Sequence, residues 1–271
     1  MNYQIIVLDL DGTLTNSEKK ITPKTKAALM KAQEKGVKVV LASGRPTGGI
    51  APLANELELE RYSGYVMAYN GGVIIHWATQ EILFEQKLDE TFVPYLFDKT
   101  RQNKMAILTY QGEKIAASDI EDEYVKHEAF INKMPLVQYD DFVNQVIHPI
   151  NKCLIVGEPC ALAQLEGEIN REMGERMSAY RSADFFLECV PMGVDKAYSL
   201  EKLTAALGID KSEVVACGDG YNDLSMIEWA GMGVAMQNAN DEVKKAANFI
   251  TFSNEEDGVA HVVEKFFLAK N

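Results

Sequence analysis

The feature that most constrains the fold is a repeated alternation between short apolar runs and longer amphipathic segments. Residues 5–8 (IIVL) form such a run and end directly at Asp9, and residues 37–42 (VKVVLA) form another after a helical segment that starts near Thr22-Pro23. Continuous apolar runs of this length are typical of strands buried on both faces of a parallel sheet. The order strand, helix, strand therefore predicts a parallel α/β sheet with right-handed crossovers.

The middle of the chain follows a different pattern. Residues 104–110 and 113–118 predict a hairpin joined at Gln111-Gly112, and further helices and short strands follow up to about residue 190. The strand–helix alternation then returns and continues to the end of the chain. We therefore expect an α+β module inserted into a parallel-sheet domain. The predicted domains are residues 1–84 with 191–271, and residues 85–190.

The composition restricts the partners of the chain. Its 271 residues include 27 basic and 40 acidic side chains, which give a formal net charge of -13 at pH 7. An acidic surface repels nucleic acid and anionic lipid, so we expect neither as a partner. The four cysteines lack C-x-x-C spacing, and three lie in apolar runs, as buried free thiols do in a reducing cytoplasm. The absence of a signal-peptide pattern and of about 18 consecutive apolar residues also favours a cytoplasmic protein, whose oligomeric state the sequence does not indicate.

Two aspartates follow the first apolar run, at the start of Asp9-Leu10-Asp11-Gly12-Thr13. Ligands of open α/β sheets bind at the carboxyl ends of the strands, where Asp9 and Asp11 would point to the same side. Like charges this close repel each other unless a cation lies between them. Gly12 lets the backbone turn and present its amides to an anion. The alternative is a surface turn with two solvated aspartates, because Asp-Gly is common in turns.

A second acidic segment, Gly218-Asp219-Gly220-Tyr221-Asn222-Asp223, follows another predicted buried strand. Asp219 and Asp223 would complete an oxygen-rich cation site. Carboxylate ligands without a nearby histidine favour Mg²⁺ over zinc. The alternative is a helix cap at Asn222, which explains one acidic position but not two acids placed four residues apart.

Two further residues suit the binding of a phosphate group. Ser43 follows the strand at residues 37–42, and a hydroxyl with the following amide at a helix N-terminus binds phosphate oxygens well. Taken alone, Ser43 is favoured as an ordinary helix cap. Lys196 begins a predicted helix, where the helix dipole disfavours a cation, so its position invites a functional explanation. A solvated surface lysine is the alternative.

These segments together predict one site at the edge of the sheet, and they also resemble a known family. DLDGT, the serine of LASGR, the lysine of GVDKA and GDGYND, in this order and spacing, resemble the four motifs of the haloacid dehalogenase superfamily. The chain is most similar to the Cof-type phosphatases, which insert a large α/β cap between the second and third motifs. The resemblance extends over essentially the whole chain.

The resemblance implies a Rossmann-like core domain with an inserted cap, and a Mg²⁺-dependent phosphatase that acts on small phosphorylated metabolites, sugar phosphates foremost. It implies that Asp9 is the nucleophile and that Asp11 acts first as the acid and then as the base. The implied metal ligands are Asp9, Asp219, the Asp11 backbone carbonyl and, directly or through water, Asp223. The implied phosphate-binding residues are Ser43, Lys196, Asn222 and the amides near Leu10 and Gly44.

Two other functions stay open. A phosphohexomutase-type phosphotransferase would need a cap that retains a bisphosphate through several of its basic residues. A non-catalytic phosphosugar-binding protein would have a degenerate site, which the intact acids disfavour. Substrate contacts are the least determined part of the site: Asn70 and Gly71 follow the third predicted strand, while Arg181 and Glu188 lie in the insertion, where an ordinary salt bridge is an equal expectation.

Overall fold

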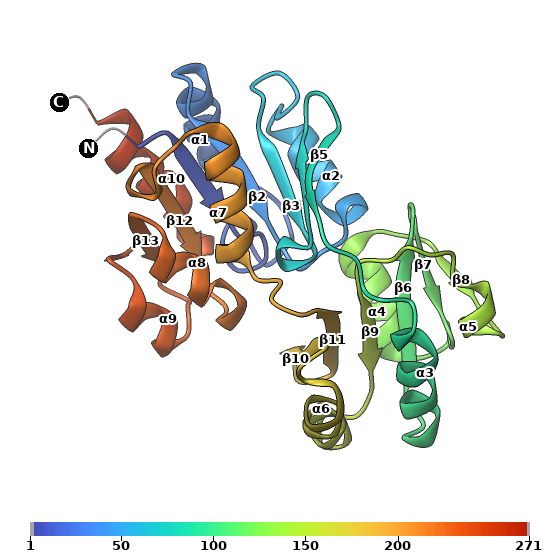
Figure 1. The fold of residues 1–271 in the computed structure, drawn as a ribbon. Helices are drawn as coiled ribbons and strands as arrows, with labels where there is room; N and C mark the ends of the chain where they lie inside the picture. Colours follow the sequence, from blue (N-terminus) through green and yellow to red (C-terminus); the bar gives the residue numbers. More distant parts are fainter. Residues whose placement is uncertain (1–2, 270–271) are drawn as a thin grey trace. The chain divides into compact units, whose positions relative to one another are not determined.

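The chain forms two compact units (Figure 1). The structure, a computed structural model, describes residues 3–269. One unit contains the chain up to Glu85 and again from Asp195 onward, and the other runs from Gln86 to Val194. Because the chain leaves the first unit and later returns to it, the second unit is inserted in the sequence of the first.

An eight-stranded sheet forms the centre of the first unit. Its strands are β1 (Ile5–Leu8), β2 (Lys38–Ala42), β3 (Tyr65–Ala68), β4 (Val73–His76), β5 (Glu81–Glu85), β12 (Val214–Gly218), β13 (Met232–Ala235) and β14 (Phe249–Ile250). They lie in the order β14-β13-β12-β1-β2-β3-β4-β5. The pairs from β14 to β3 are parallel, as the alternation predicts. By contrast, β4 and β5 form an antiparallel hairpin at the edge, which the sequence pattern did not indicate.

Several helices of the first unit begin or end at recognisable sequence signals. They are α1 (Pro23–Glu34), α2 (Thr47–Glu56), α7 (Lys196–Leu207), α8 (Leu224–Trp229), α9 (Asp241–Ala246) and α10 (Gly258–Val263), which continues as a π-helical turn over Glu264–Leu268. At the start of α1, the Thr22 hydroxyl accepts a hydrogen bond from the Thr25 amide at 3.2 Å, and Pro23 occupies the first helical position. Gly208, in the left-handed conformation at φ 66°, ends α7.

Both faces of this sheet are buried under helices. Successive side chains of a strand point to opposite faces, so Ile6 and Leu8 join one apolar cluster while Ile5 and Val7 join the other. The first cluster includes residues of α1, α2 and α10, and the second includes residues of α7, α8 and α9. The result is a three-layer α/β arrangement that fixes the strand ends, and therefore the site, within a rigid frame.

The second unit has a six-stranded mixed sheet in the order β10-β11-β9-β6-β7-β8. Its strands are β6 (Ala106–Gln111), β7 (Lys114–Ala117), β8 (Leu136–Gln138), β9 (Cys153–Val156), β10 (Met177–Ala183) and β11 (Phe186–Pro191). Its helices are α3 (Phe92–Gln102), α4 (Glu123–Asn132), α5 (Phe142–Gln145) and α6 (Pro159–Met173). The predicted hairpin is confirmed as β6 and β7, which pair antiparallel, and the only parallel pair among the described strands of this sheet is β7 with β8. The sequence analysis did not anticipate α3, β8 or α5.

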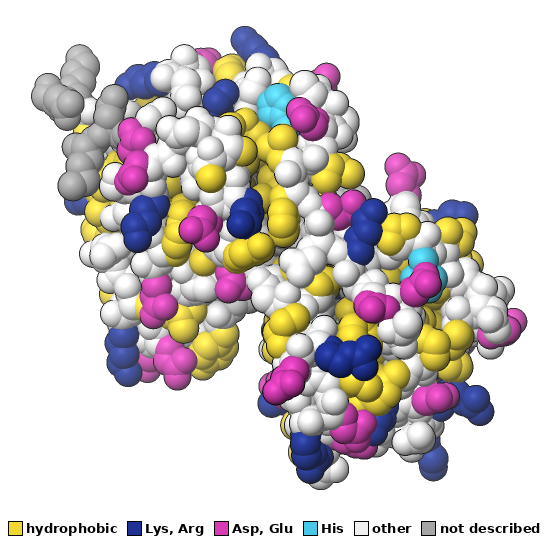
Figure 2. Space-filling view, viewed as in Figure 1, with side chains coloured by type: hydrophobic (Ala, Val, Ile, Leu, Met, Phe, Trp, Pro, Cys, Tyr) yellow, Lys and Arg dark blue, Asp and Glu magenta, His cyan; other side chains and the backbone are white. Residues whose placement is uncertain are grey.

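The placement of three of the four cysteines agrees with the prediction from the sequence. Cys153, Cys189 and Cys217 are buried free thiols, as their apolar neighbours predict, while Cys160 is exposed. On the face shown in Figure 2, acidic and basic side chains are interspersed among apolar and neutral ones. Within residues 3–269, no helix combines the length and the apolar character that a membrane span requires.

Candidate active site

The candidate site lies in the first unit, at the carboxyl ends of three adjacent parallel strands. Asp9 directly follows β1, Ser43 follows β2 and Asp219 follows β12. Lys196 is the first residue of α7, and Asp223 ends the one-turn helix Tyr221–Asp223 that follows β12. The fold thus places segments from distant parts of the chain at the edge where open α/β sheets bind ligands.

Lys196 is the central cation of the site. Its ammonium nitrogen Nζ donates to Asp9 Oδ1 at 2.7 Å, to Asp223 Oδ1 at 2.6 Å and to the Ala42 carbonyl at 2.9 Å. These three bonds use all three donors of the ammonium group, and the side chain is 0% exposed. Burial by itself would lower the pKa of Lys196, but the charges of Asp223 and Asp9 outweigh it and raise that pKa. The alternative of a solvated surface lysine is therefore wrong.

Three carboxylates converge around this lysine. Asp9, Asp219 and Asp223 each offer an oxygen within 4.8 Å of the others. Burial and the charge of Asp223 raise the pKa of Asp9 well above its usual range, although Lys196 opposes the shift, and burial raises the pKa of Asp219 to about 6. One lysine does not neutralise three acids. Because carboxylate oxygens are the ligands that Mg²⁺ prefers, the donor set fits a divalent cation of this kind.

The three acids differ in how their oxygens are used. Asp223 accepts from Lys196 through Oδ1, and its Oδ2 accepts from the backbone amides of Asp219 and Gly220, both at 2.9 Å. Asp223 therefore shapes the loop after β12 and orients the lysine.

The loop after β1 requires its glycine. Gly12 has φ 88°, and a Cβ atom at this position would lie 2.2 Å from Asp219 Oδ2. Only glycine combines this left-handed conformation with such a close approach. Next to it, the Thr13 hydroxyl donates to Asp219 Oδ1 at 2.7 Å and so orients the carboxylate. The sequence analysis missed this role of Thr13, although its place in the DLDGT segment was a usable signal.

Asp11 is held by two cations that the sequence analysis did not identify. Arg45 donates through Nε to Oδ2 at 2.8 Å and through Nη2 to Oδ1 at 2.6 Å, and Lys19 Nζ donates to Oδ1 at 2.7 Å. Burial by itself would raise the pKa of Asp11, but the hydrogen bonds and charges of Arg45 and Lys19 outweigh it and lower that pKa. Arg45 belongs to the LASGR segment, whereas nothing in the sequence near Lys19 indicates its contact.

Ser43 lies in the turn before helix α2 and not at the N-terminus of that helix. Helix α2 begins at Thr47 with Pro46 as its N-cap, so Ser43 and Gly44 lie in the preceding loop. There the Ser43 hydroxyl accepts from the Arg45 amide at 3.2 Å and closes a tight turn. Proline at residue 46 explains the difference, because it disfavours helical conformation in the residue before it. The ordinary helix-cap alternative for Ser43 is excluded by the same observation.

The end of β3 approaches the same group of residues. Asn70 Oδ1 accepts from Asn222 Nδ2 at 3.1 Å, and the Gly71 carbonyl accepts from the Ser199 hydroxyl of α7 at 2.7 Å. Gly71 has φ 102°, and a Cβ atom there would lie 2.5 Å from Ser199 Oγ. Gly71 therefore lets the first turn of α7, which carries Lys196, approach the strand closely.

The remaining predicted residues lie on other segments. Leu10 is buried beside Asp9, and its carbonyl accepts from the amide and the hydroxyl of Thr15 at 2.9 and 2.8 Å. Arg181 and Glu188 belong to the second unit, where they form the ion pairs Arg181–Glu166 and Lys152–Glu188 at 2.8 and 2.7 Å. The salt-bridge interpretation accounts for both contacts, and the substrate roles of Arg181 and Glu188 stay predictions.

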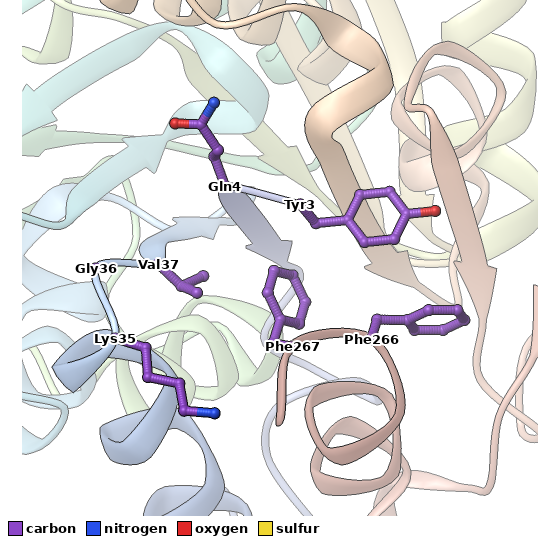
Figure 3. Close-up of a pocket in the computed structure, with 7 residues that line it drawn as sticks. All are labelled: Tyr3, Gln4, Lys35, Gly36, Val37, Phe266 and Phe267. Carbon is purple, nitrogen blue, oxygen red and sulfur yellow. The ribbon is translucent and has the colours of Figure 1, made fainter. Parts of the chain in front are cut away.

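A separate pocket of about 430 Å³ lies in the same unit, at the ends of the strands opposite to the candidate site. It is lined by Tyr3, Gln4, Lys35, Gly36, Val37, Phe266 and Phe267 (Figure 3). Tyr3 and Gln4 precede β1, and residues 35–37 precede β2, so the pocket is at the amino ends of these strands. None of its described lining residues is acidic, and it therefore lacks the ligand set found around Asp9.

Comparisons with known proteins agree with this geometry. Residues 6–263 match the family model of haloacid dehalogenase-like hydrolases. The putative phosphatase YxeH of Bacillus subtilis is 35% identical over 99% of this chain and 100% of its own length. The 5-amino-6-(5-phospho-D-ribitylamino)uracil phosphatase YcsE of the same organism is 30% identical over 99% of this chain and 97% of its own.

Solved structures show the same fold. A haloacid dehalogenase-like hydrolase from Bacteroides thetaiotaomicron is 49% identical, with a TM-score of 0.95 over 98% of this chain and 100% of that one. The protein TM0651 of Thermotoga maritima is 26% identical, with a TM-score of 0.83 over 99% of this chain and 98% of that one. The sequence match, the full-length relatives and the fold place the chain in the haloacid dehalogenase-like hydrolases, as a phosphatase of the Cof-type group.

Proposed function

We propose that the chain is a Mg²⁺-dependent phosphatase that releases inorganic phosphate from small phosphorylated metabolites, sugar phosphates foremost, through an aspartyl-phosphate on Asp9. The observation that carries this proposal is the cluster in which Lys196 holds Asp9 and Asp223 while Asp219 lies within 4.8 Å of both acids. Two buried carboxylates and one half-buried carboxylate that repel one another at the end of a strand are not expected of an unreactive surface turn.

The cation would be held by Asp9, Asp219 and the Asp11 backbone carbonyl, with Asp223 behind them. When bound, Mg²⁺ supplies positive charge against the developing negative charge of the phosphoryl oxygens. Lys196 supplies a second fixed positive charge. Because its side chain is buried away from water, its electrostatic attraction for the phosphoryl oxygens would be stronger than in water. Ser43, Asn222 and the amides near Leu10 and Gly44 would hold the remaining phosphoryl oxygens.

In the first half of the reaction, a carboxylate oxygen of Asp9 attacks phosphorus while the bond from phosphorus to the ester oxygen breaks. Asp11 gives its proton to that leaving oxygen. In the second half, Asp11 takes a proton from water, whose oxygen attacks phosphorus and releases Asp9 together with inorganic phosphate. The ion pairs with Arg45 and Lys19 hold Asp11 ionised, which suits the second half. The first half requires Asp11 to leave these pairs and carry a proton.

We assign substrate choice to the second unit, which we interpret as the cap domain. The end of β3 at Asn70 would contribute to this choice. The name of the relative YcsE describes a phosphate on a ribityl chain, and a phosphorylated polyol is close in chemistry to a sugar phosphate. We place the enzyme in the cytoplasm, which fits its four free cysteines.

A substrate screen tests the proposal. Purified protein with Mg²⁺ should release phosphate from at least one member of a panel of sugar phosphates, polyol phosphates and nucleotides, and chelation of Mg²⁺ should stop the reaction. Glucose 1-phosphate and mannose 1-phosphate should yield free sugar. Formation of the 6-phosphate instead would identify a phosphotransferase, and failure on the whole panel would favour a non-catalytic binding protein.

A further inference from the structure

We infer that Asn70 is a positioning residue that holds Asn222 ready to bind the phosphate group. This inference rests on the proposed function, since it adds a residue to the phosphate-binding site described above. Asn70 acts through Asn222 and through the loop that carries Ser43 and Gly44. Four features of the structure carry the assignment.

The first feature is the contact between the two asparagines. Asn70 is only 3% exposed, whereas Asn222 is an exposed residue of a single helical turn. Asn70 Oδ1 accepts from Asn222 Nδ2 at 3.1 Å. An exposed side chain populates several rotamers, and fixing one of them costs entropy when a ligand binds. A buried partner that selects one rotamer beforehand reduces this cost.

The second feature is the backbone connection to the other phosphate-binding loop. The amide of Asn70 donates to the Ser43 carbonyl at 2.9 Å, and the amide of Tyr69 donates to the Arg45 carbonyl at 3.1 Å. These bonds fix the loop that carries the Ser43 hydroxyl and the Gly44 amide. The segment at Asn70 is thereby bonded to both the 43–45 loop and the 220–223 turn.

The third feature is the position of the Asn70 carboxamide. A Cβ atom added to Gly44 would lie 3.1 Å from Asn70 Nδ2 and 3.2 Å from Asn70 Oδ1. The carboxamide therefore lies directly against the Gly44 backbone while it also accepts from Asn222. One side chain separates and orients two groups that are proposed to bind the same phosphate.

The fourth feature is the backbone conformation at the end of β3. Asn70 has φ 55° and ψ 31°, Tyr69 has φ 55° and Gly71 has φ 102°. Asparagine is one of the few residues other than glycine that adopt this left-handed region readily. The conformation alone would explain an asparagine here without any role for its carboxamide. Glycine at position 70 separates the two explanations, because it keeps the backbone conformation and removes only the side chain.

The test combines Asn70→Gly with a double-mutant cycle. Wild type, Asn70→Gly, Asn222→Ala and the double variant are compared by titration with inorganic phosphate in saturating Mg²⁺, and by KM and kcat for p-nitrophenyl phosphate. Loss of one orienting hydrogen bond should weaken phosphate affinity and raise KM by up to about tenfold, with a smaller change in kcat. In the Asn222→Ala background, Asn70→Gly should have a smaller effect than in the wild-type background, because the part of its effect that passes through Asn222 is already lost.

Ser63→Gly is the matched control. Ser63 also has a left-handed backbone, with φ 53°, and it precedes β3 at the opposite end from Asn70. This variant should match wild type in phosphate affinity and KM. If Asn70→Gly also keeps wild-type values, or if its effect is undiminished in the Asn222→Ala background, the inference about Asn70 fails while the phosphatase function stands. If wild type neither hydrolyses p-nitrophenyl phosphate nor binds phosphate, both fail together.

Discussion

Each unit of the molecule buries one lysine among carboxylates, and the two clusters differ in how the acids are satisfied. In the first unit, Lys196 is 0% exposed and binds Asp9 and Asp223. In the second unit, Lys152 is 2% exposed and binds Glu188 at 2.7 Å. Both clusters remove a cation from water, so burial of an ion pair by itself does not identify an active site.

The acids of the second cluster are saturated by neutral donors. Ser182 donates to Glu188 Oε1 at 2.9 Å. Nearby, Glu128 Oε1 accepts from the Tyr110 hydroxyl at 2.6 Å and from Asn132 Nδ2 at 2.7 Å. Lys152 also lies over the ring of Tyr110, 5.1 Å from its centroid. Such a buried network holds elements of a domain together, although Asn132 Oδ1 within it has no hydrogen-bond partner.

The first cluster keeps an excess of negative charge. Asp9, Asp219 and Asp223 face one another, and their mutual repulsion and burial are only partly offset by Lys196. Folded proteins retain such an electrostatically unfavourable cluster at functional sites, where the carboxylates bind a cation or take part in a reaction. We therefore propose a structural role for the cluster at Lys152 and a chemical role for the cluster at Lys196, and the two proposals make different predictions.

The largest effect is expected for Asp9→Asn. This change removes the proposed nucleophile, so turnover of any substrate found in the screen should fall by at least about a thousandfold. It also removes one of three repelling acids, so the melting temperature without Mg²⁺ should stay equal or rise. Circular dichroism and a phosphate-release assay measure both results. Appreciable residual hydrolysis would remove Asp9 from its role.

Lys196→Ala should follow in size. The cation that we propose to face the phosphoryl group is lost, and removal of one such fixed charge costs about a hundredfold to a thousandfold in kcat. Lys202, exposed and on the same helix, provides the matched control, and Lys202→Ala should retain wild-type turnover. Equal loss in the two variants, measured per folded molecule, would refute the phosphate-clamp role.

Lys152→Ala should lower stability strongly and activity only slightly, the opposite of what we expect for the variants at the Lys196 cluster. Removing the lysine leaves Glu188 buried without its cation, which costs about 3–5 kcal/mol of unfolding free energy. Urea denaturation should show this loss, while kcat per folded molecule should change far less than in Lys196→Ala. A comparable fall in kcat with unchanged stability would show that the second cluster takes part in the chemistry.

The smallest effect concerns pH. Burial raises the pKa of Glu128 above its usual value of 4.5, so the folded protein keeps a proton that the unfolded chain releases. Stability should therefore fall as pH rises from about 4.5 towards the folded-state pKa, by at most about 1.4 kcal/mol per pH unit. Glu128→Gln should flatten this part of the stability profile. The exposed Glu123→Gln should leave the profile unchanged, and an identical slope in all three proteins would contradict the account.

Much of the fold was predictable because its signals are local. Local sequence patterns indicate the conformation of the segment in which they occur. Examples are the apolar runs of β1 and β2, the cap at Thr22 and the glycine after α7. The edge hairpin of β4 and β5 was missed because antiparallel pairing is a tertiary choice, and β5 is largely exposed with acids at both ends. Helix α5 has only four residues, too few for a periodic pattern.

In the candidate site, too, the residues with local sequence signals were predicted, whereas contacts between separate loops were not. Asp9, Asp11, Asp219 and Lys196 were predicted because each occupies a recognisable place next to a strand or helix end. The contacts of Arg45 and Lys19 with Asp11 were not, because they depend on how separate loops meet. The buried position of Asn70 beside Asn222 likewise joins residues 152 positions apart. Sequence spacing indicates which residues reach the strand edge, but not which of them touch.

The central claim is the covalent intermediate on Asp9, and chemical trapping tests it most directly. Borohydride reduces an acyl phosphate to an alcohol, so quenching the enzyme during turnover should convert Asp9 to homoserine, detected by mass spectrometry of the peptide that contains it. The account predicts this change at Asp9 only with substrate and Mg²⁺ present, and never in Asp9→Asn. Steady release of phosphate with Asp9 unmodified, or with the modification at another residue, would contradict it.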